Sequence, residues 1–182
     1  MIFLNYVGKI DYQGAYSLLD HLSGAKVDGH TEVVVTIASP GGITEAGLML
    51  FHQISAHPLA ITTHNVGCVD SAAFSVFLAG KNRVASPSSC FMIHLPKKGF
   101  DPKARFNAND LTLMAQDLLQ QERALVSNYS TRMTAPEQDI RQWLTEGKRF
   151  SAEEALAAGI VSSIQPLAYP DDAQIYTLGG RD

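Results

Sequence analysis

Hydrophobic and polar residues alternate along the chain in blocks that predict strands and helices in turn. Short apolar or β-branched runs, such as Glu-Val-Val-Val-Thr-Ile at 32–37, are typical of strands buried on both faces of a parallel sheet. Apolar residues at helical spacing follow most of these runs. The predicted strands are 2–6, 32–37, 60–66, 83–85, 90–94 and 160–164, and the predicted helices are 11–22, 44–57, 71–79 and 108–133, with two more beginning near 134–136 and at 151.

Local signals sharpen several of these boundaries. Asp11 is a candidate N-cap, Ser151 and Glu154 form a capping box, and Gly159 ends the helix that this box begins. The helix at 108–133 is longer than most globular helices, so we expect it to project from the body. Without an internal repeat or linker, residues 1–182 predict a single α/β domain, with a tail from 166 to 182 that is loop or an extra edge segment.

Composition narrows the class of protein. The chain has 182 residues, 46% of them hydrophobic, which is enough for one sizeable core. A net charge of −4 argues against a nucleic-acid partner. The longest apolar run, 72–80, is too short to span a membrane, and the start has no basic region or cleavage site, so we expect a cytoplasmic protein. Cys68 and Cys90 have neither metal-ligand spacing nor a disulfide framework, and we expect no metal and no cofactor.

Three stretches contain residues that could carry chemistry. Ser-Pro-Gly-Gly at 39–42 lies between a strand and a helix, where exposed amides could face a developing negative charge, although such a turn is more often only a turn. Ser71 begins a helix, either as an N-cap or as a nucleophile on a tight turn, and Asp70 is an equally good N-cap. His94 ends an apolar strand, where a lone histidine is more often structural.

In their order and spacing, these stretches resemble the proteolytic subunit of the ATP-dependent Clp protease. The resemblance rests on four motifs and runs from the first strand to about residue 164. The motifs are Ser-Pro-Gly-Gly at 39–42, Ser71 at 29 residues past the second glycine, Met-Ile-His-x-Pro at 92–96, and Arg-Phe-Ser-Ala-x-Glu-Ala at 149–155 followed by Gly-Ile-Val at 159–161.

The resemblance implies a role for each matching residue. Ser71 corresponds to the nucleophile of the family and His94 to its general base, and the backbone amides of Gly42 and Ala72 correspond to its oxyanion hole. The strand edge that contains Gly41 and Ile43 would pair with the backbone of an extended peptide.

The resemblance also implies a fold and an assembly. The fold is the Clp protease/crotonase superfold, a spiral of β-β-α units with a protruding helical handle, here at about 97–133. The implied function is a serine endopeptidase that hydrolyses unfolded polypeptides or short peptides inside a ring-shaped chamber. Its rings are heptamers or double heptamers joined by the handles, and the apolar stripe of the long helix is then buried between subunits.

One position of the catalytic triad departs from the family. The family has an aspartate immediately before Arg-Phe, and this chain has Lys148 there, which cannot accept the imidazole N–H. Three interpretations compete: Glu146 supplies the carboxylate; Ser71 and His94 act as a slow dyad with the ring oriented by a backbone carbonyl or water; or the protein is an inactive ring-forming homologue with a structural or regulatory role. Because Lys148 occupies the acid position, we expect the peptidase activity to be weak.

Two further expectations concern partners and chemistry. In the family, a segment before Ile-Phe-Leu helps to engage the ATPase, and here the sequence starts at Met1, which puts partnership with an AAA+ unfoldase in question. A crotonase-like acyl-CoA enzyme is the remaining alternative, because that superfold shares the paired-amide oxyanion hole. The motifs around Ser71 and His94 favour the peptidase.

Overall fold

A single mixed sheet organises the molecule. The computed structural model describes residues 1–179. Its strand order is β6-β5-β3-β2-β1-β8, with β4 on β3 and β7 on β4, and every pairing is parallel except that of β5 with β6. The strands are β1 (Ile2–Val7), β2 (Glu32–Ser39), β3 (Ala60–Asp70), β4 (Asn82–Ala85), β5 (Cys90–Met92), β6 (Arg149–Ser151), β7 (Ser163–Ile164) and β8 (Gln174–Leu178).

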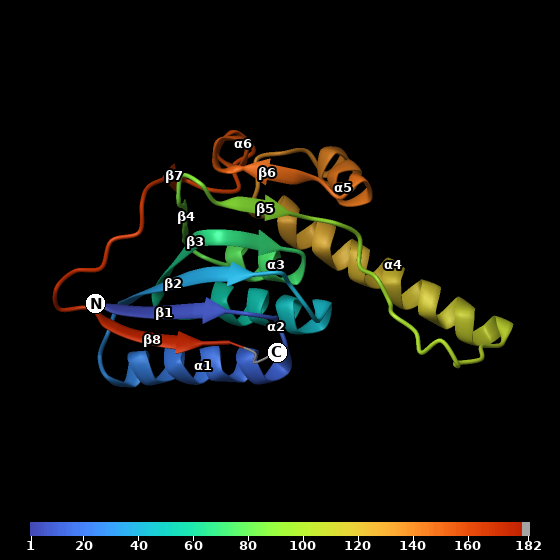
Figure 1. The fold of residues 1–182 in the computed structure, drawn as a ribbon, viewed down its shortest axis with the longest axis horizontal. Helices are drawn as coiled ribbons and strands as arrows, with labels where there is room; N and C mark the ends of the chain where they lie inside the picture. Colours follow the sequence, from blue (N-terminus) through green and yellow to red (C-terminus); the bar gives the residue numbers. More distant parts are fainter. Residues whose placement is uncertain (180–182) are drawn as a thin grey trace.

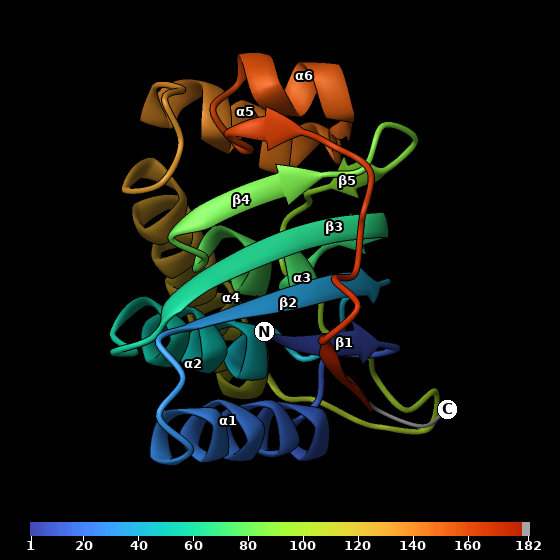
Figure 2. The same ribbon diagram turned by 90° about the vertical axis from the view of Figure 1, so that its left-hand side faces the viewer.

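Helices cover one face of this sheet, and the longest helix, α4, extends past its edge. In Figure 1, α1 lies below the strands, α2 lies behind them at the level of β1, and α4 extends away from the body. Figure 2 shows the other face, where the segment that leads from β7 to β8 runs across the strands. The helices are α1 (Tyr12–Val27), α2 (Thr44–Ser55), α3 (Ala72–Leu78), α4 (Ala108–Ser130), α5 (Glu137–Glu146) and α6 (Ala152–Ala157).

The fold confirms the predicted α/β class and most of the predicted elements. Asp11 caps α1 by accepting a hydrogen bond from the Gly14 N–H at 2.7 Å, and the capping box of Ser151 and Glu154 is formed at α6. In the predicted tail, residues 174–178 form the edge strand β8 beside β1, whereas residues 180–182 lie outside the described part.

Strand β3 forks, and this places the site. Its first half pairs with β4 through Thr62–Asn65, and its second half pairs with β5 through Cys68–Asp70. The register of β3 on β2 also shifts after Ile37. The strand therefore continues to Asp70, past the predicted end at residue 66, and delivers the following residue to the carboxyl edge of the sheet.

The long helix is anchored at one end only. Leu125, Val126 and Tyr129 of α4 are buried, and the Tyr129 ring packs edge-on against Phe74 at 5.0 Å between centroids. The opposite half is uncovered, with Leu111 53% exposed. The stripe expected at a subunit interface is thus divided: its C-terminal part packs on the body of the same chain, and its N-terminal part projects (Figure 1).

Candidate active site

Ser71 lies on a strained turn between β3 and α3. Its φ of 55° and ψ of −124° make it the only non-glycine residue with positive φ in the described part of the chain. The Ser71 N–H donates to the Met92 carbonyl at 2.8 Å, which ties the turn to β5. The side chain makes no capping hydrogen bond to α3. The strain therefore does not serve a helix cap, and the hydroxyl is left available for other chemistry.

The glycine turn at 39–42 lies directly against this serine. Gly41 has a φ of 90°, and a Cβ placed on it would lie 2.6 Å from both Ser71 Cβ and the Asp70 carbonyl oxygen. Ser39 Oγ accepts a hydrogen bond from the Gly41 N–H at 3.1 Å and so shapes the turn. Only glycine allows the two backbone segments to approach this closely.

Two backbone amides near Ser71 are not used by the fold. Gly42 forms an isolated parallel bridge with Ile10, made by the Ile10 N–H to the Gly41 carbonyl and the Ile43 N–H to the Ile10 carbonyl, both at 2.8 Å. Within residues 1–179, this pattern leaves the Gly42 N–H without an acceptor. The Ala72 N–H, at the first position of α3, also has no acceptor among the described residues. Such amides are what an oxyanion hole requires.

His94 lies two residues beyond β5, beside the end of β3. Its Nδ1 atom is 2.6 Å from the Leu95 carbonyl oxygen. Because a carbonyl only accepts, Nδ1 carries the proton and Nε2 is the basic nitrogen. The backbone is held on both sides, by the Ile93 N–H to the Lys148 carbonyl at 3.0 Å and the Leu95 N–H to the Leu144 carbonyl at 2.9 Å.

Ser71 and His94 follow the ends of the neighbouring parallel strands β3 and β5, but the structure does not join them by a hydrogen bond. No such bond is present between Ser71 Oγ and His94 within residues 1–179. Hydrogen bonds of this kind are often long in enzymes without substrate and shorten when substrate binds. The arrangement therefore has the parts of a serine–histidine pair in an open geometry.

Lys148 and Glu146, the two residues considered for the acid position, direct their side chains to groups other than His94. The ammonium of Lys148 lies over the rings of Trp143 and Phe150, at 4.8 and 5.0 Å from their centroids. Glu146 is the last residue of α5, and its carboxylate accepts a hydrogen bond from Gln142 Nε2 at 2.7 Å. The group that orients the His94 ring in this structure is the Leu95 carbonyl.

The structure brings a further carboxylate to the site, which the sequence suggested only as a helix cap. Asp70 precedes Ser71 and pairs in register with Met92, two residues before His94. Burial raises the pKa of the Asp70 carboxyl, and the charges of Arg149 and His94 oppose this rise. Only the parallel register of β3 with β5 shows that Asp70 lies near His94. This register joins distant segments of the chain, so no short motif contains it.

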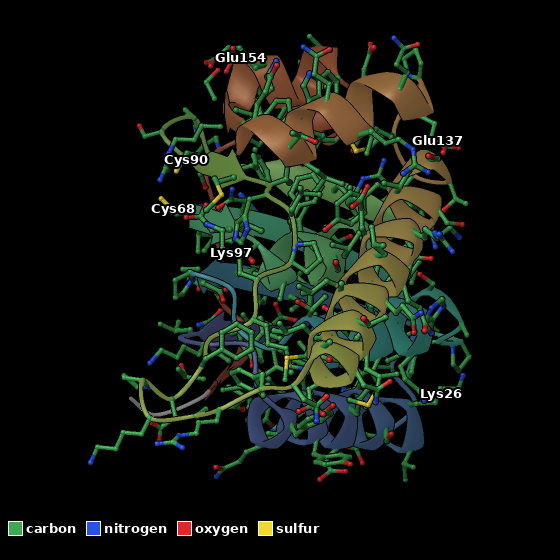
Figure 3. The ribbon with its side chains drawn as sticks, turned by 90° about the vertical axis from the view of Figure 1, so that its right-hand side faces the viewer. Lys26, Cys68, Cys90, Lys97, Glu137 and Glu154 are labelled. Carbon is green, nitrogen blue, oxygen red and sulfur yellow. The ribbon has the colours of Figure 1, made fainter. Side chains whose placement is uncertain are left out.

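A cavity of about 290 Å³ lies beside the glycine turn, between the start of α2 and the handle. Gly42, Ile43 and Leu118 are among its lining residues, together with Lys97, which is labelled in Figure 3. Gln121 Nε2 of α4 donates to Glu45 Oε1 of α2 at 2.8 Å and connects the two walls. The backbone edge expected to hold a peptide therefore opens onto a space bordered by the handle.

Other chemistry-bearing residues do not form a second centre. Cys68 and Cys90 are free thiols on adjacent strands near the same end of β3 (Figure 3). Within residues 1–179, no group of three or more His, Cys, Asp or Glu side chains is arranged to hold a metal ion. No helix in that range is long and apolar enough to cross a membrane.

Comparison with known proteins gives two findings. The sequence model of the Clp protease family matches residues 2–166. Among solved structures, a mutant of ClpP1 from Listeria monocytogenes superposes with a TM-score of 0.81 over 91% of each chain, at 20% sequence identity. The second finding confirms that the fold is that of the Clp protease/crotonase class.

Proposed function

Because the chain belongs to the Clp protease family, we propose that it is a serine peptidase that hydrolyses unfolded polypeptides or short peptides inside a chamber built from rings of its own copies. The observation that carries the proposal is the strained backbone of Ser71, which presents a hydroxyl without a structural task beside two unused amides. Strain of this kind is retained where function requires it.

Each residue of the site has a role in the proposed reaction. Ser71 Oγ attacks the scissile carbonyl while His94 Nε2 takes its proton and then gives it to the leaving amine. The Gly42 and Ala72 amides receive the negative charge on the carbonyl oxygen. Water then attacks the acyl-enzyme by the same path in reverse and releases the acid. The Gly41–Ile43 edge holds the substrate backbone in extended form.

Activity is expected to be weak, because the ring is oriented by a neutral group. The Leu95 carbonyl fixes the tautomer of His94, but it carries no full charge with which to stabilise an imidazolium. Lys148 at the position of the family acid brings a positive charge instead. This observation also favours the second candidate function, a ring-forming homologue with a structural or regulatory role.

Ring assembly through the handle is part of the proposal. The projecting half of α4 has the apolar side chains of Leu111 and Leu113 53% and 55% exposed, and Phe100 and Phe106 form an exposed edge-on pair beside it. A projecting apolar surface of this length favours burial against other subunits. We propose heptameric rings, single or paired.

Labelling with a fluorophosphonate probe tests the proposal and separates the two candidates. We expect the wild type to be labelled, Ser71→Ala to lose all labelling, and His94→Ala to lose most of it, with hydrolysis of an unstructured fluorogenic peptide following the same order. Ser55→Ala, which removes an exposed hydroxyl at the end of α2, is the matched control and should behave as the wild type. An unlabelled, correctly assembled wild type contradicts the peptidase and supports the structural role.

A further inference from the structure

Asp70 has a half-buried carboxylate, and one of its two oxygens accepts no hydrogen bond in the described part of the chain. Its Oδ1 atom is shielded from solvent and has no hydrogen-bond partner in the described structure. It caps neither α3 nor any other helix there. An ionised carboxylate without partners is costly to bury, so a residue of this kind at the edge of a site calls for a functional explanation.

The sheet register shows which groups this carboxylate faces. Asp70 on β3 is opposite Met92 on β5, and Met92 is opposite Arg149 on β6. Residues in register across strands point to the same face of a sheet, and the residues two positions along a strand do so as well. Asp70 and Arg149 therefore flank the strand that leads to His94, on one face.

The charged and titratable groups around Asp70 come from three strands. Arg149 on β6 and His94 after β5 both favour the ionised carboxylate. Cys68 and Cys90 pair with each other two residues before the Asp70–Met92 pair. Burial is the main cause that raises the pKa of the Cys90 thiol to about 11, and the charge of Asp70 adds to this rise. The ionic groups that act on the Asp70 carboxyl are therefore Arg149 and His94.

We propose that Asp70 is a positioning residue that performs the electrostatic task of the missing triad acid, stabilising the protonated ring of His94 through space during catalysis. The inference rests on the proposed peptidase function. Two tasks that one aspartate performs in the usual triad are divided here: the Leu95 carbonyl fixes the tautomer, and the Asp70 carboxylate compensates the charge.

This division has two consequences of opposite sign. The interaction with His94 exists only when the ring is charged, whereas the cost of burying the carboxylate, which outweighs the attraction of Arg149, is present in the resting enzyme. Asp70→Asn removes both. We therefore expect the variant to be more stable than the wild type and less active, with kcat/KM lower by about tenfold.

The pH profile of peptide hydrolysis separates this role from a merely structural one. In Asp70→Asn, the acidic limb of the kcat/KM profile should move to lower pH, because the protonated ring of His94 is no longer favoured. Asp70→Glu retains the charge and should keep the wild-type limb. Asp20→Asn makes the same chemical change at an exposed position of α1 and should alter neither rate nor profile. An unmoved limb in Asp70→Asn overturns the proposal, whatever the rate.

A double-mutant cycle on thermal stability tests the same coupling without relying on activity. The melting temperatures of wild type, Asp70→Asn, His94→Gln and the double variant are compared at pH 8 and pH 5.5. We expect the two effects to be less additive at pH 5.5 than at pH 8, because the proposed interaction requires a protonated ring. If the enzyme is active and the two effects are additive at both pH values, the proposed role of Asp70 is wrong and the peptidase function stands. Coupling at pH 5.5 in a protein that the fluorophosphonate does not label supports the Asp70–His94 interaction and contradicts only the peptidase function.

Discussion

At the scale of single residues, the closest constraint in the site is the contact of Gly41 with Ser71. A methyl group on Gly41 would collide with the Ser71 side chain and the Asp70 carbonyl, and the φ of 90° is itself unfavourable for alanine. The nucleophile and the turn that supplies the Gly42 amide therefore keep their relative position only while residue 41 has no side chain.

Gly41→Ala should lose fluorophosphonate labelling by more than tenfold and lower the melting temperature by several degrees, since left-handed strain alone costs about 1–3 kcal/mol. Gly29→Ala is the matched control, because its φ of 83° is similar but nothing lies within 4 Å of the added methyl. It should show the loss of stability from strain and retain full labelling. Equal labelling of the two variants would mean that the Gly41 contact does not matter for catalysis.

Substitutions at the acid position decide among the interpretations that the sequence left open. Lys148→Asp should raise kcat/KM by about tenfold, because the backbone of residue 148 bonds to Ile93, the neighbour of His94, and the change replaces a cation with a carboxylate that can stabilise the charged ring. Glu146→Gln should change little, since its hydrogen bond goes to Gln142. Lys148→Met retains the packing on Trp143 without the charge and serves as the control. A large loss in Glu146→Gln would show that this loop rearranges to supply the acid.

At the scale of secondary-structure elements, local patterns were sufficient where the structure depends on neighbours in the sequence. Caps, capping boxes and buried β-branched runs predicted β2, α6 and the start of α1 closely, whereas α1 continues to Val27, past its predicted end at residue 22. The predicted strand at 90–94 ends at Met92, because the backbone around His94 bonds to the α5–β6 segment instead of to β3. Pairing between distant segments, which also extends β3 and brings Asp70 to the site, leaves little trace in any short window of sequence.

The projecting half of α4 is the proposed contact between subunits. Replacing Leu111 and Leu113 together by Glu should reduce a heptamer-based assembly to smaller species, as measured by size-exclusion chromatography with light scattering, because charges in a buried interface are costly. The fold should survive, since the packed end of α4 at Tyr129 is not touched. Val27→Glu, at a highly exposed apolar residue of α1, is the control and should leave the assembly intact. A wild type that is a stable monomer at micromolar concentration contradicts the ring proposal.

At the scale of the whole molecule, a buried histidine in the sheet links stability to pH. His64 of β3 is 6% exposed, and its Nε2 lies 3.1 Å from Ser86 Oγ. Burial lowers the pKa of His64 below its usual value, so the unfolded chain binds a proton near pH 6 that the folded chain does not. The free energy of unfolding should therefore fall as the pH drops below about 6.5.

His64→Gln should reduce this acid sensitivity. Between pH 7.5 and 5.5, we expect the melting temperature of the variant to fall by about 2–4 °C less than that of the wild type. The same substitution at His52, an exposed residue of α2, should leave the pH dependence unchanged. Parallel pH curves for wild type and His64→Gln would show that other groups govern the acid response.

The pairing of β1 with β8 also bears on how the protein is made. The two strands come from opposite ends of the described chain. There, β1 pairs with β2 along one edge and with β8 along the other (Figure 1). While the ribosome is still translating the segments between them, β1 offers an open hydrogen-bonding edge to any other nascent chain. Release of residues 174–178 closes that edge, so slow translation of the 3′ part of the message would lengthen the period in which neighbouring polypeptides on one polysome can aggregate.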